Sequence, residues 1–450
     1  MIRPVIIGGG FAGLSAAVQL AAQGLQPLVL EARPHLGGRA YSFTDGATGE
    51  QIDNGQHAMM GCYTHALAFL ERIGATRKLV RQSNLRVAMA ERGGGAGVIA
   101  CPALPGPLHM IKAVLGYRLL GRRDRWRALL GGVRIRGLYR RAPARLVAST
   151  VAELLATLGQ SAHAQASFWN PVAIATLNET PARASAAPFA AVLARAFFGA
   201  RRDSQFVLPR VGLSELYTDD ARRFIETHGG RVELRAAVAQ LDLRDGRIAA
   251  VSLRDGRRIA TDACIAAVPP PALAAVVPEP LRDVAPFRTL GGFVGSPIVS
   301  IHLWLDRPVF QPDFLGLLGT TTQWIFNRSA LRGEPNGGQS LSAVISAGHE
   351  VVDWDNARIA ATAIDDLQAV VPAARAAQVT RSVVVRERNA TISNTPAAER
   401  LRPSAHTPIA NLFLAGDWTA TGLPPTIESA AASGDRAAAL LVERLQSPRL

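Results

Sequence analysis

The run Pro4-Val5-Ile6-Ile7-Gly8-Gly9-Gly10-Phe11-Ala12-Gly13 decides the fold of this 450-residue chain. Its apolar start is typical of a short buried strand, and the alanine-rich stretch after it predicts a helix to about Gln23. In the turn between them, Gly8 permits the tight backbone, Gly10 lets a phosphate approach closely, and Gly13 allows helix and strand to pack together. Because the free N–H groups at the helix start would face that phosphate, the run predicts a dinucleotide-binding unit.

A second strand and an acidic residue follow the helix. Leu28-Val29-Leu30 predicts a strand that ends at Glu31, whose carboxylate would accept hydrogen bonds from a ribose. The loop Gly37-Gly38-Arg39 comes next and can bring backbone amides and a guanidinium close to a diphosphate. The dinucleotide contacts that this part of the sequence predicts are Gly8, Gly10, Phe11, Ala12, Gly13, Glu31, Ala32, Arg33, Gly38, Arg39 and Ala40.

The last part of the sequence predicts a second turn. Asn411-Leu-Phe-Leu-Ala-Gly416-Asp417 is typical of a buried strand that runs into a glycine and an acid. Pro424-Pro425 suits a helix start, and we expect a helix from Ser429 to about Leu445. Its positive end at Thr426 and Ile427 would stabilise negative charge on the N1–C2=O edge of a reduced flavin. These features favour FAD as the dinucleotide, with contacts from Gly416, Asp417, Thr426 and Ile427.

Together these pieces resemble the FAD-dependent amine oxidase and carotenoid desaturase superfamily. A third piece, Gly230–Leu241, fits too, and the resemblance implies that the backbone of Val238 contacts the adenine. The chain has two lysines, Lys78 and Lys112, both far from the region where amine oxidases of this superfamily hold a water near the flavin. Amine oxidation therefore loses support. No cysteine lies near Gly416, so we expect FAD to be bound non-covalently.

The expected fold class is α/β, with a Rossmann-like FAD-binding domain of the GR2 type. We expect this domain to be assembled from the discontinuous segments 1–95, 200–275 and 405–450. An α+β substrate domain would cover 276–404, and 96–199 would form its helical, basic, membrane-facing part.

One motif narrows the resemblance. Asp53-Asn54-Gly55-Gln56-His57 is similar to the pattern of a squalene-associated group that contains the bacterial hydroxysqualene dehydroxylases of hopanoid biosynthesis. The resemblance implies reductive removal of water from hydroxysqualene to give squalene, with bound FADH2 as hydride donor and Asn54, Gly55 and Gln56 lining the flavin. An electron donor must also reduce the flavin, and the sequence does not identify it.

This chemistry needs an acid, a dry apolar pocket and a hydride donor. His57 is the candidate acid because its ordinary pKa is about 6.5, and Asp53 would orient it if positions 53, 55 and 57 share one face of a regular strand. A flavin contact or a purely structural role are the alternatives for His57. Trp169, Trp324 and Phe326 are candidate walls of the substrate pocket, with ordinary core packing as the alternative.

A basic stripe covers 101–145, where eleven basic residues stand against one acid, Asp124. Apolar residues recur there at helical spacing, with Trp126 and Tyr117 as expected interfacial anchors, which is typical of helices on an anionic membrane surface. A solvated basic surface is the alternative, and no nucleic-acid-binding motif accompanies the charge.

Three cysteines without a Cys-x-x-Cys pair fit a reducing compartment. The first strand begins almost at once, leaving no room for a signal segment. We therefore expect a cytoplasmic protein held peripherally on the inner face of the bacterial cytoplasmic membrane. No metal-binding pattern stands out. The alternative functions are a flavin-dependent desaturase or isomerase of a carotenoid precursor such as phytoene, and a lipid carrier that keeps FAD for structure only.

Overall fold

A five-stranded parallel sheet organises the first part of the computed structural model, which describes residues 3–333 and 337–446. In spatial order its strands are β10 (Arg231–Glu233), β2 (Leu28–Leu30), β1 (Val5–Ile7), β14 (Cys264–Ala266) and β20 (Leu412–Leu414). The inner strands are continuously apolar, as expected where helices cover both faces of a parallel sheet. The beginning, middle and end of the chain all contribute strands, which gives the mixed α/β fold that the sequence predicts.

Two long helices pack against each other beside this sheet, α1 (Phe11–Ala22) and α15 (Ile427–Gln446). Helix α15 begins two residues before the expected Ser429. A side chain at Gly434 of α15 would place its Cβ only 2.3 Å from the carbonyl oxygen of Ala12. Glycine is required there because the two helix backbones approach so closely.

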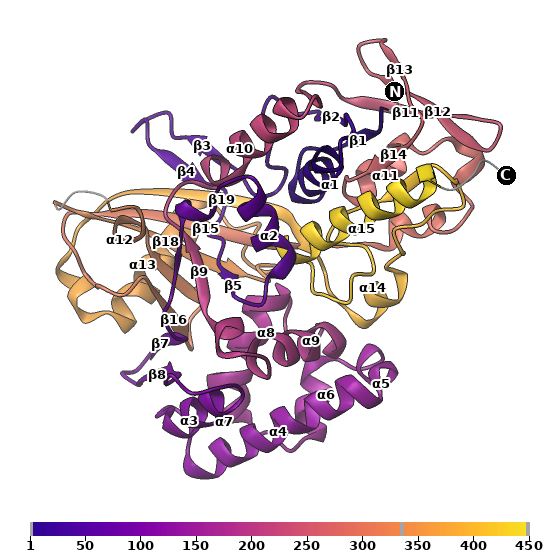
Figure 1. The fold of residues 1–450 in the computed structure, drawn as a ribbon. Coiled ribbons are helices and arrows are strands. Elements are labelled where there is room, and N and C mark those ends of the chain that lie inside the picture. Colours follow the sequence, from indigo (N-terminus) through magenta and orange to yellow (C-terminus); the bar gives the residue numbers. More distant parts are fainter. Residues whose placement is uncertain (1–2, 334–336, 447–450) are drawn as a thin grey trace.

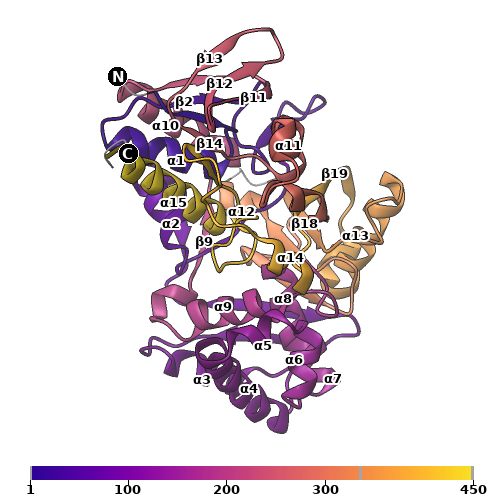
Figure 2. The same cartoon turned by 90° about the vertical axis from the view of Figure 1, so that its right-hand side faces the viewer.

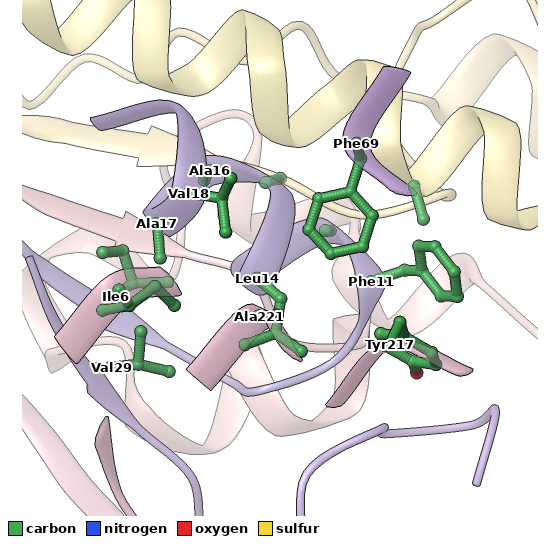
Figure 3. Close-up of a cluster of buried hydrophobic side chains, with 14 of the residues drawn as sticks. Ile6, Phe11, Leu14, Ala16, Ala17, Val18, Val29, Phe69, Tyr217 and Ala221 are labelled. Carbon is green, nitrogen blue, oxygen red and sulfur yellow. The ribbon is translucent and has the colours of Figure 1, made fainter. Parts of the chain in front are cut away.

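The core under the glycine turn contains three aromatic rings from three elements (Figure 3). The ring of Phe11 lies 4.1 Å from that of Tyr217 and 5.6 Å from that of Phe69, measured between centroids. Phe69 belongs to α2 (Thr64–Arg72) and Tyr217 to α10 (Leu213–Thr227). Burial of such a ring stabilises the fold by about 1.5–3 kcal/mol, so α2 and α10 are anchored to the start of α1.

A seven-stranded, mixed sheet forms the second part of the molecule. In spatial order its strands are β19 (Val379–Ile392), β15 (Gly295–Leu305), β18 (Gln339–Ser346), β17 (Trp324–Asn327), β16 (Phe314–Leu318), β7 (Arg86–Glu91) and β8 (Ala96–Ala100). Alternate residues of β15, such as Val299 and Ile301, belong to the core cluster shared with α13 (Asn356–Val370). Ser300 and His302 therefore point to the opposite face of the sheet.

The second sheet shifts two of the expected domain boundaries. Strand β7 lies within 1–95, the range assigned to the FAD-binding domain, but it pairs with β16. Strand β8 lies within 96–199, where we expected helices, and it pairs with β7. The reason is that these two segments pair antiparallel and form a hairpin at the edge of the second sheet.

Smaller elements connect the two large sheets. They are the sheet β11 (Val238–Arg244), β12 (Arg247–Leu253) and β13 (Arg258–Ala260), the sheet β5 (Met59–Met60), β9 (Phe206–Pro209) and β6 (Leu79–Arg81), the pair β3 (Ser42–Thr44) and β4 (Gln51–Asp53), and the helices α11 (Pro270–Val276), α12 (Arg328–Arg332) and α14 (Pro396–Leu401).

Seven helices form the third part and gather at one end of the molecule, away from α1 and α15 (Figures 1 and 2). They are α3 (Leu108–Gly116), α4 (Arg122–Arg141), α5 (Pro143–Val147), α6 (Val151–Thr157), α7 (Ala162–Ala164), α8 (Asn170–Leu177) and α9 (Ala186–Phe197). Within the described residues, no helix is both long and apolar enough to cross a membrane.

The expected interfacial residues of this part divide into two groups. Trp126, Leu130 and Val133 on α4 are 60%, 56% and 61% exposed, and Leu108 on α3 is also exposed. Tyr117 is fully buried instead, and its hydroxyl donates a hydrogen bond to the Ser167 carbonyl oxygen. The prediction of an interfacial Tyr117 is therefore wrong, because the chain turns inward between α3 and α4.

Candidate active site

The glycine turn between β1 and α1 has the close packing that its sequence predicts. Gly8 has φ +106°, and a Cβ on Gly13 would lie 1.9 Å from the Gly8 carbonyl oxygen. Gly10 directly precedes α1 and provides no side-chain cap. Gly38 approaches Gly10 so closely that a Cβ on Gly38 would lie 3.1 Å from the Gly10 Cα. Two glycines thus face each other at the start of α1, and a diphosphate fits this backbone cradle.

Glu31 is held rigidly at the end of β2. Its carboxylate accepts hydrogen bonds from the Gly9 amide at 2.7 Å and from the Arg33 amide at 2.8 Å. Its backbone oxygen accepts one from Ala236, two residues before Val238. The predicted ribose and adenine contacts, including Ala32, therefore lie together at this edge of the first sheet.

The loop that contains Gly38 and Arg39 is fixed by a buried tyrosine that sequence reasoning missed. The hydroxyl of Tyr217 is 2.9 Å from the Gly37 carbonyl oxygen and 2.8 Å from that of Ala40. Burial raises the pKa of Tyr217, so the hydroxyl remains a donor. Sequence reasoning could not predict this role, because a Tyr on the apolar face of a helix can also be an ordinary core residue.

The C-terminal turn joins this loop through an ion pair. Arg39 donates to the Asp417 carboxylate at 2.6 Å and to the Ala390 carbonyl oxygen at 3.1 Å. Gly416, just before Asp417, has φ +143°, a conformation that L side chains rarely adopt. The first and last segments of the chain thus meet beside the glycine cradle.

A buried arginine, Arg402, organises the loop after Asp417 and was also missed. Its guanidinium donates to the carbonyl oxygens of Asp417, Thr419 and Leu423 at 2.7 to 2.9 Å. These bonds fix the approach to α15, whose first residue, Ile427, follows Thr426 as predicted. The signal that could have found it is an Arg directly followed by Pro, about ten residues before the last strand.

Asn54 connects three segments at the centre of the molecule. Its side-chain amide donates to the Arg39 carbonyl oxygen at 2.9 Å and to the Glu387 carboxylate at 3.2 Å, and its oxygen accepts from the Tyr41 amide at 3.1 Å. Glu387 belongs to β19 of the second sheet. Burial raises the pKa of Tyr41, and the negative charge of Glu387 adds to that shift.

Glu387 is the main functional candidate that the sequence did not reveal. It places a carboxylate from the second sheet beside the loop of Asn54, Gly55, Gln56 and His57. Its only sequence signal was an acid between Arg386 and Arg388, just after three valines, and many strand acids face solvent. The pairing of β19 with β15, which sets its direction, depends on residues far away in sequence.

Asp53 does not orient His57, contrary to our expectation. Strand β4 ends at Asp53, so the alternation that would align the two side chains does not continue. Its carboxylate accepts hydrogen bonds from the Ser42 hydroxyl at 2.7 Å, the Leu213 amide at 2.9 Å and the Arg332 guanidinium at 3.0 Å. Asp53 therefore ties β4 to α10 and α12.

His57 is in the expected loop, and its Nδ1 lies 3.0 Å from the Gly55 carbonyl oxygen. Burial lowers the pKa of His57, although the Gly55 carbonyl and the charges of Asp53 and Glu387 oppose that shift. The neutral imidazole is therefore favoured near neutral pH. This disfavours the protonated form in which His57 would act as an acid.

The three expected pocket residues, Trp169, Trp324 and Phe326, belong to one hydrophobic cluster. Phe326 and Trp324 are neighbours of Phe314 on the second sheet, with ring centroids 5.7 Å and 6.2 Å from it. Trp169 instead packs among the helices, where its indole N–H donates to Gln160 at 2.8 Å. All three pack within this cluster, and their role as walls of a substrate pocket stays a prediction.

Comparison with known proteins identifies the family. The model of a family described as flavin containing amine oxidoreductase matches residues 11–442. The chain belongs to this family. It is therefore a flavin-dependent oxidoreductase, and the glycine cradle and the Arg39–Asp417 pair fit its cofactor. In the described ranges, no cluster of three His, Cys, Asp or Glu side chains could hold a metal ion.

Relatives within the family narrow the type of enzyme. A hydroxysqualene dehydroxylase from Sinorhizobium fredii is 30% identical, over 97% of each chain. A zeta-carotene desaturase from Solanum lycopersicum is 26% identical, over 98% of this chain and 81% of the relative. The fold is similar to the crystal structure of an oxidoreductase from Methanosarcina mazei, with a TM-score of 0.75, 19% identity and coverage of 96% and 99%. The chain is thus a hydroxysqualene dehydroxylase-like oxidoreductase.

Proposed function

We propose that the protein removes the hydroxyl group of hydroxysqualene reductively and forms squalene, as a step of hopanoid or squalene biosynthesis. The observation that carries this proposal is the similarity to hydroxysqualene dehydroxylases over nearly the whole of both chains. The aromatic sheet face around Phe326 supports it, since a long isoprenoid needs an apolar wall.

We further propose that the flavin is FAD, bound non-covalently. Glu31 and Val238 would hold the adenosine end, the backbone cradle of Gly10 and Gly38 the diphosphate, and Arg39 and Asp417 the part between diphosphate and flavin ring. The start of α15 at Thr426 and Ile427 would stabilise negative charge on the ring. When bound in reduced form, FAD supplies a hydride and with it the two electrons that the reaction consumes.

The residues of the chain would guide the rest of the chemistry. The C–O bond of the substrate breaks with its electron pair on oxygen, which takes up a proton and leaves as water, while a C–H bond replaces it. The Glu387 carboxylate would stabilise positive charge that develops on the substrate carbon, and a low dielectric strengthens such an interaction. The side chains of Phe326 and Trp324 would exclude bulk water from this cation.

A second candidate is desaturation or isomerisation of a carotenoid precursor such as phytoene. It is favoured by the similarity to zeta-carotene desaturases. It would run the flavin chemistry in the oxidative direction and would need no acid and no leaving water.

We also propose that α3 and α4 rest on the anionic inner face of the cytoplasmic membrane. The apolar patch, as we call it, consists of Leu104, Leu108, Ile111, Trp126, Leu130 and Val133. These are six of the eight large hydrophobic side chains that are exposed among residues 3–333 and 337–446. Arginines of α4 such as Arg123, Arg127 and Arg134 are exposed among them. Apolar side chains beside basic ones are the pattern of an interfacial helix, and an apolar substrate is stored in the bilayer.

The experiment that tests this function uses dithionite-reduced holoenzyme under anaerobic conditions. With hydroxysqualene we expect squalene to form and the flavin to be reoxidised in equal amounts. Formation of a desaturated product from phytoene by the oxidised enzyme would support the second candidate instead. Reduced enzyme that leaves hydroxysqualene unchanged would contradict the proposal.

A further inference from the structure

Three buried polar side chains of the second sheet each carry an atom that has no hydrogen-bond partner within the described part of the chain. They are Ser300 and His302 of β15 and Ser342 of β18, which are 0%, 1% and 1% exposed. The unpaired atoms are the two hydroxyl oxygens and Nδ1 of His302. Because an unpaired buried polar atom costs about 1–3 kcal/mol, three in one place indicate a missing partner.

The three side chains share one face of the sheet. His302 and Ser342 are directly opposite each other in the register of β15 and β18. Ser300 lies two positions before His302, on the same face. The Cβ of an alanine at position 55 would lie 3.3 Å from the Ser300 hydroxyl oxygen. The cluster therefore lies directly beneath the loop expected to line the flavin.

The hydrogen-bonding capacity of the cluster can be read from His302. Its Nε2 is 3.0 Å from the Asp53 carbonyl oxygen, which can only accept, so Nε2 carries the proton. Burial lowers the pKa of His302 to about 3, and the ring is neutral. Nδ1 is then an acceptor, while each serine hydroxyl can donate or accept. One acceptor and two hydroxyls complement a group that both donates and accepts, namely an O–H.

Apolar side chains flank this cluster on β17 and β18, while the charges of Arg328 and Arg332 also act on His302. Phe326 lies opposite Ser342 across β17 and β18, and Val344 lies opposite Ser300 across β15 and β18. A hydrocarbon in contact with this wall would leave all three polar groups unpaired. A hydrocarbon with a single hydroxyl would pair them.

We infer that Ser300, His302 and Ser342 form the binding site of the substrate hydroxyl. The same site holds the water molecule that this hydroxyl becomes when it leaves. This inference rests on the proposed function and adds the residues that distinguish an alcohol from a hydrocarbon. Before substrate binds, one ordered water occupies the site.

A crystal structure of the oxidised holoenzyme tests the resting state. We expect an ordered water within about 3.2 Å of His302 Nδ1 and of at least one of the two serine hydroxyls. A direct hydrogen bond from the Ser342 hydroxyl to His302 Nδ1 with no water present would overturn the inference.

A binding experiment on the oxidised holoenzyme tests the ligand without turnover. The change in flavin absorbance gives the affinities for hydroxysqualene and for squalene. We expect hydroxysqualene to bind at least about tenfold more tightly, because a buried polar site rejects an analogue that lacks the hydroxyl. In the double variant S300A/S342A this preference should fall to within about threefold.

S382A is the matched control, because Ser382 is exposed on the neighbouring strand β19 and pairs with Leu303 of the opposite face. It should keep the wild-type preference. An unchanged preference in S300A/S342A with normal flavin content contradicts the inference. If that variant does not fold, equal affinities of the wild type for both ligands contradict it. Tighter binding of hydroxysqualene than of squalene without squalene formation would support the hydroxyl site and refute the proposed function. Squalene formation with equal affinities for the two ligands would support the proposed function and refute the hydroxyl site.

Discussion

The guanidinium of Arg39 lies 2.6 Å from the carboxylate of Asp417, although 378 residues separate the two in the sequence. Arg39 follows the glycine pair of the N-terminal part, and Asp417 follows the last strand of the first sheet. Asp417 is almost fully buried, so the pair is screened less than an ordinary surface ion pair. The contact joins the two ends of the chain beside the glycine cradle.

Replacing Arg39 by Ala should weaken FAD binding by about tenfold or more, since a charge-assisted hydrogen bond contributes about 1.5–3 kcal/mol. Titration of the apoprotein with FAD, followed by fluorescence quenching, measures this change. R222A removes an exposed arginine that pairs with Glu226 on α10 and should bind FAD like the wild type. Equal FAD affinities of R39A and R222A would refute the assigned role.

Replacing Tyr217 by Phe should lower the free energy of unfolding by about 1–2 kcal/mol and also weaken FAD binding. The cause is loss of the hydroxyl that donates to the loop of Gly37 and Ala40. Urea denaturation and FAD titration give the two values. Y117F removes a comparable buried hydroxyl bond to Ser167 in the helical part, so it should lose stability but keep its FAD affinity. The account fails here if both variants bind FAD equally well.

Replacing Glu387 by Gln should slow squalene formation about 10²-fold or more while FAD stays bound. The amide has the same shape as the carboxylate but no charge to stabilise a cation. Single-turnover kinetics of the reduced enzyme measure the rate. E350Q, which changes an exposed acid near one end of the same sheet, serves as control. A rate for E387Q within about threefold of wild type would exclude an electrostatic role.

His302 makes stability depend on pH. Its folded pKa of about 3 is below the ordinary value of about 6.5, so the unfolded chain binds the proton more readily. The contribution of neutral His302 to the free energy of unfolding is therefore complete above pH 6.5, and it is lost as the pH falls toward 3. Between pH 7 and pH 5 the free energy of unfolding of H302Q should fall by about 2 kcal/mol less than that of the wild type.

Urea denaturation at the two pH values checks this prediction. H228Q, which changes an exposed histidine, should follow the wild type. Identical pH dependence of H302Q and wild type would show that His302 is not held neutral by burial.

Replacing Trp126, Leu130 and Val133 by Ser should reduce binding to vesicles that contain anionic lipid by about tenfold or more, because three apolar side chains no longer enter the bilayer. Co-sedimentation with vesicles measures the bound fraction. V284S/V294S changes exposed valines outside the apolar patch and should bind normally. Wild-type binding by the triple variant would exclude α4 as the contact.

The sequence predicted the parts of the site that are decided locally. A glycine turn requires particular backbone angles and close approaches, and Gly8, Gly13 and Gly416 show them. The strand runs follow from short-range patterns in the same way, and so does α15, although it begins two residues before the expected Ser429.

Contacts between distant elements could not be predicted. The alternation that would have paired Asp53 with His57 stops where β4 ends, and Asp53 turns to α10 and α12 instead. Tyr117 is amphipathic, so a bilayer surface and a buried hydrogen bond both suit it, and only the packing of α3 on α4 decides. Glu387 reaches the site because β19 pairs with β15, a pairing that no local pattern encodes.

The most direct test of the central claim is one turnover of the reduced holoenzyme with hydroxysqualene in D₂O. The N5 hydrogen of reduced flavin exchanges with solvent, so hydride transfer labels the product. Mass spectrometry and NMR should find one deuterium in squalene, at the carbon that carried the hydroxyl. Squalene without deuterium, or unchanged hydroxysqualene with the flavin still reduced, would contradict reductive dehydroxylation by this protein.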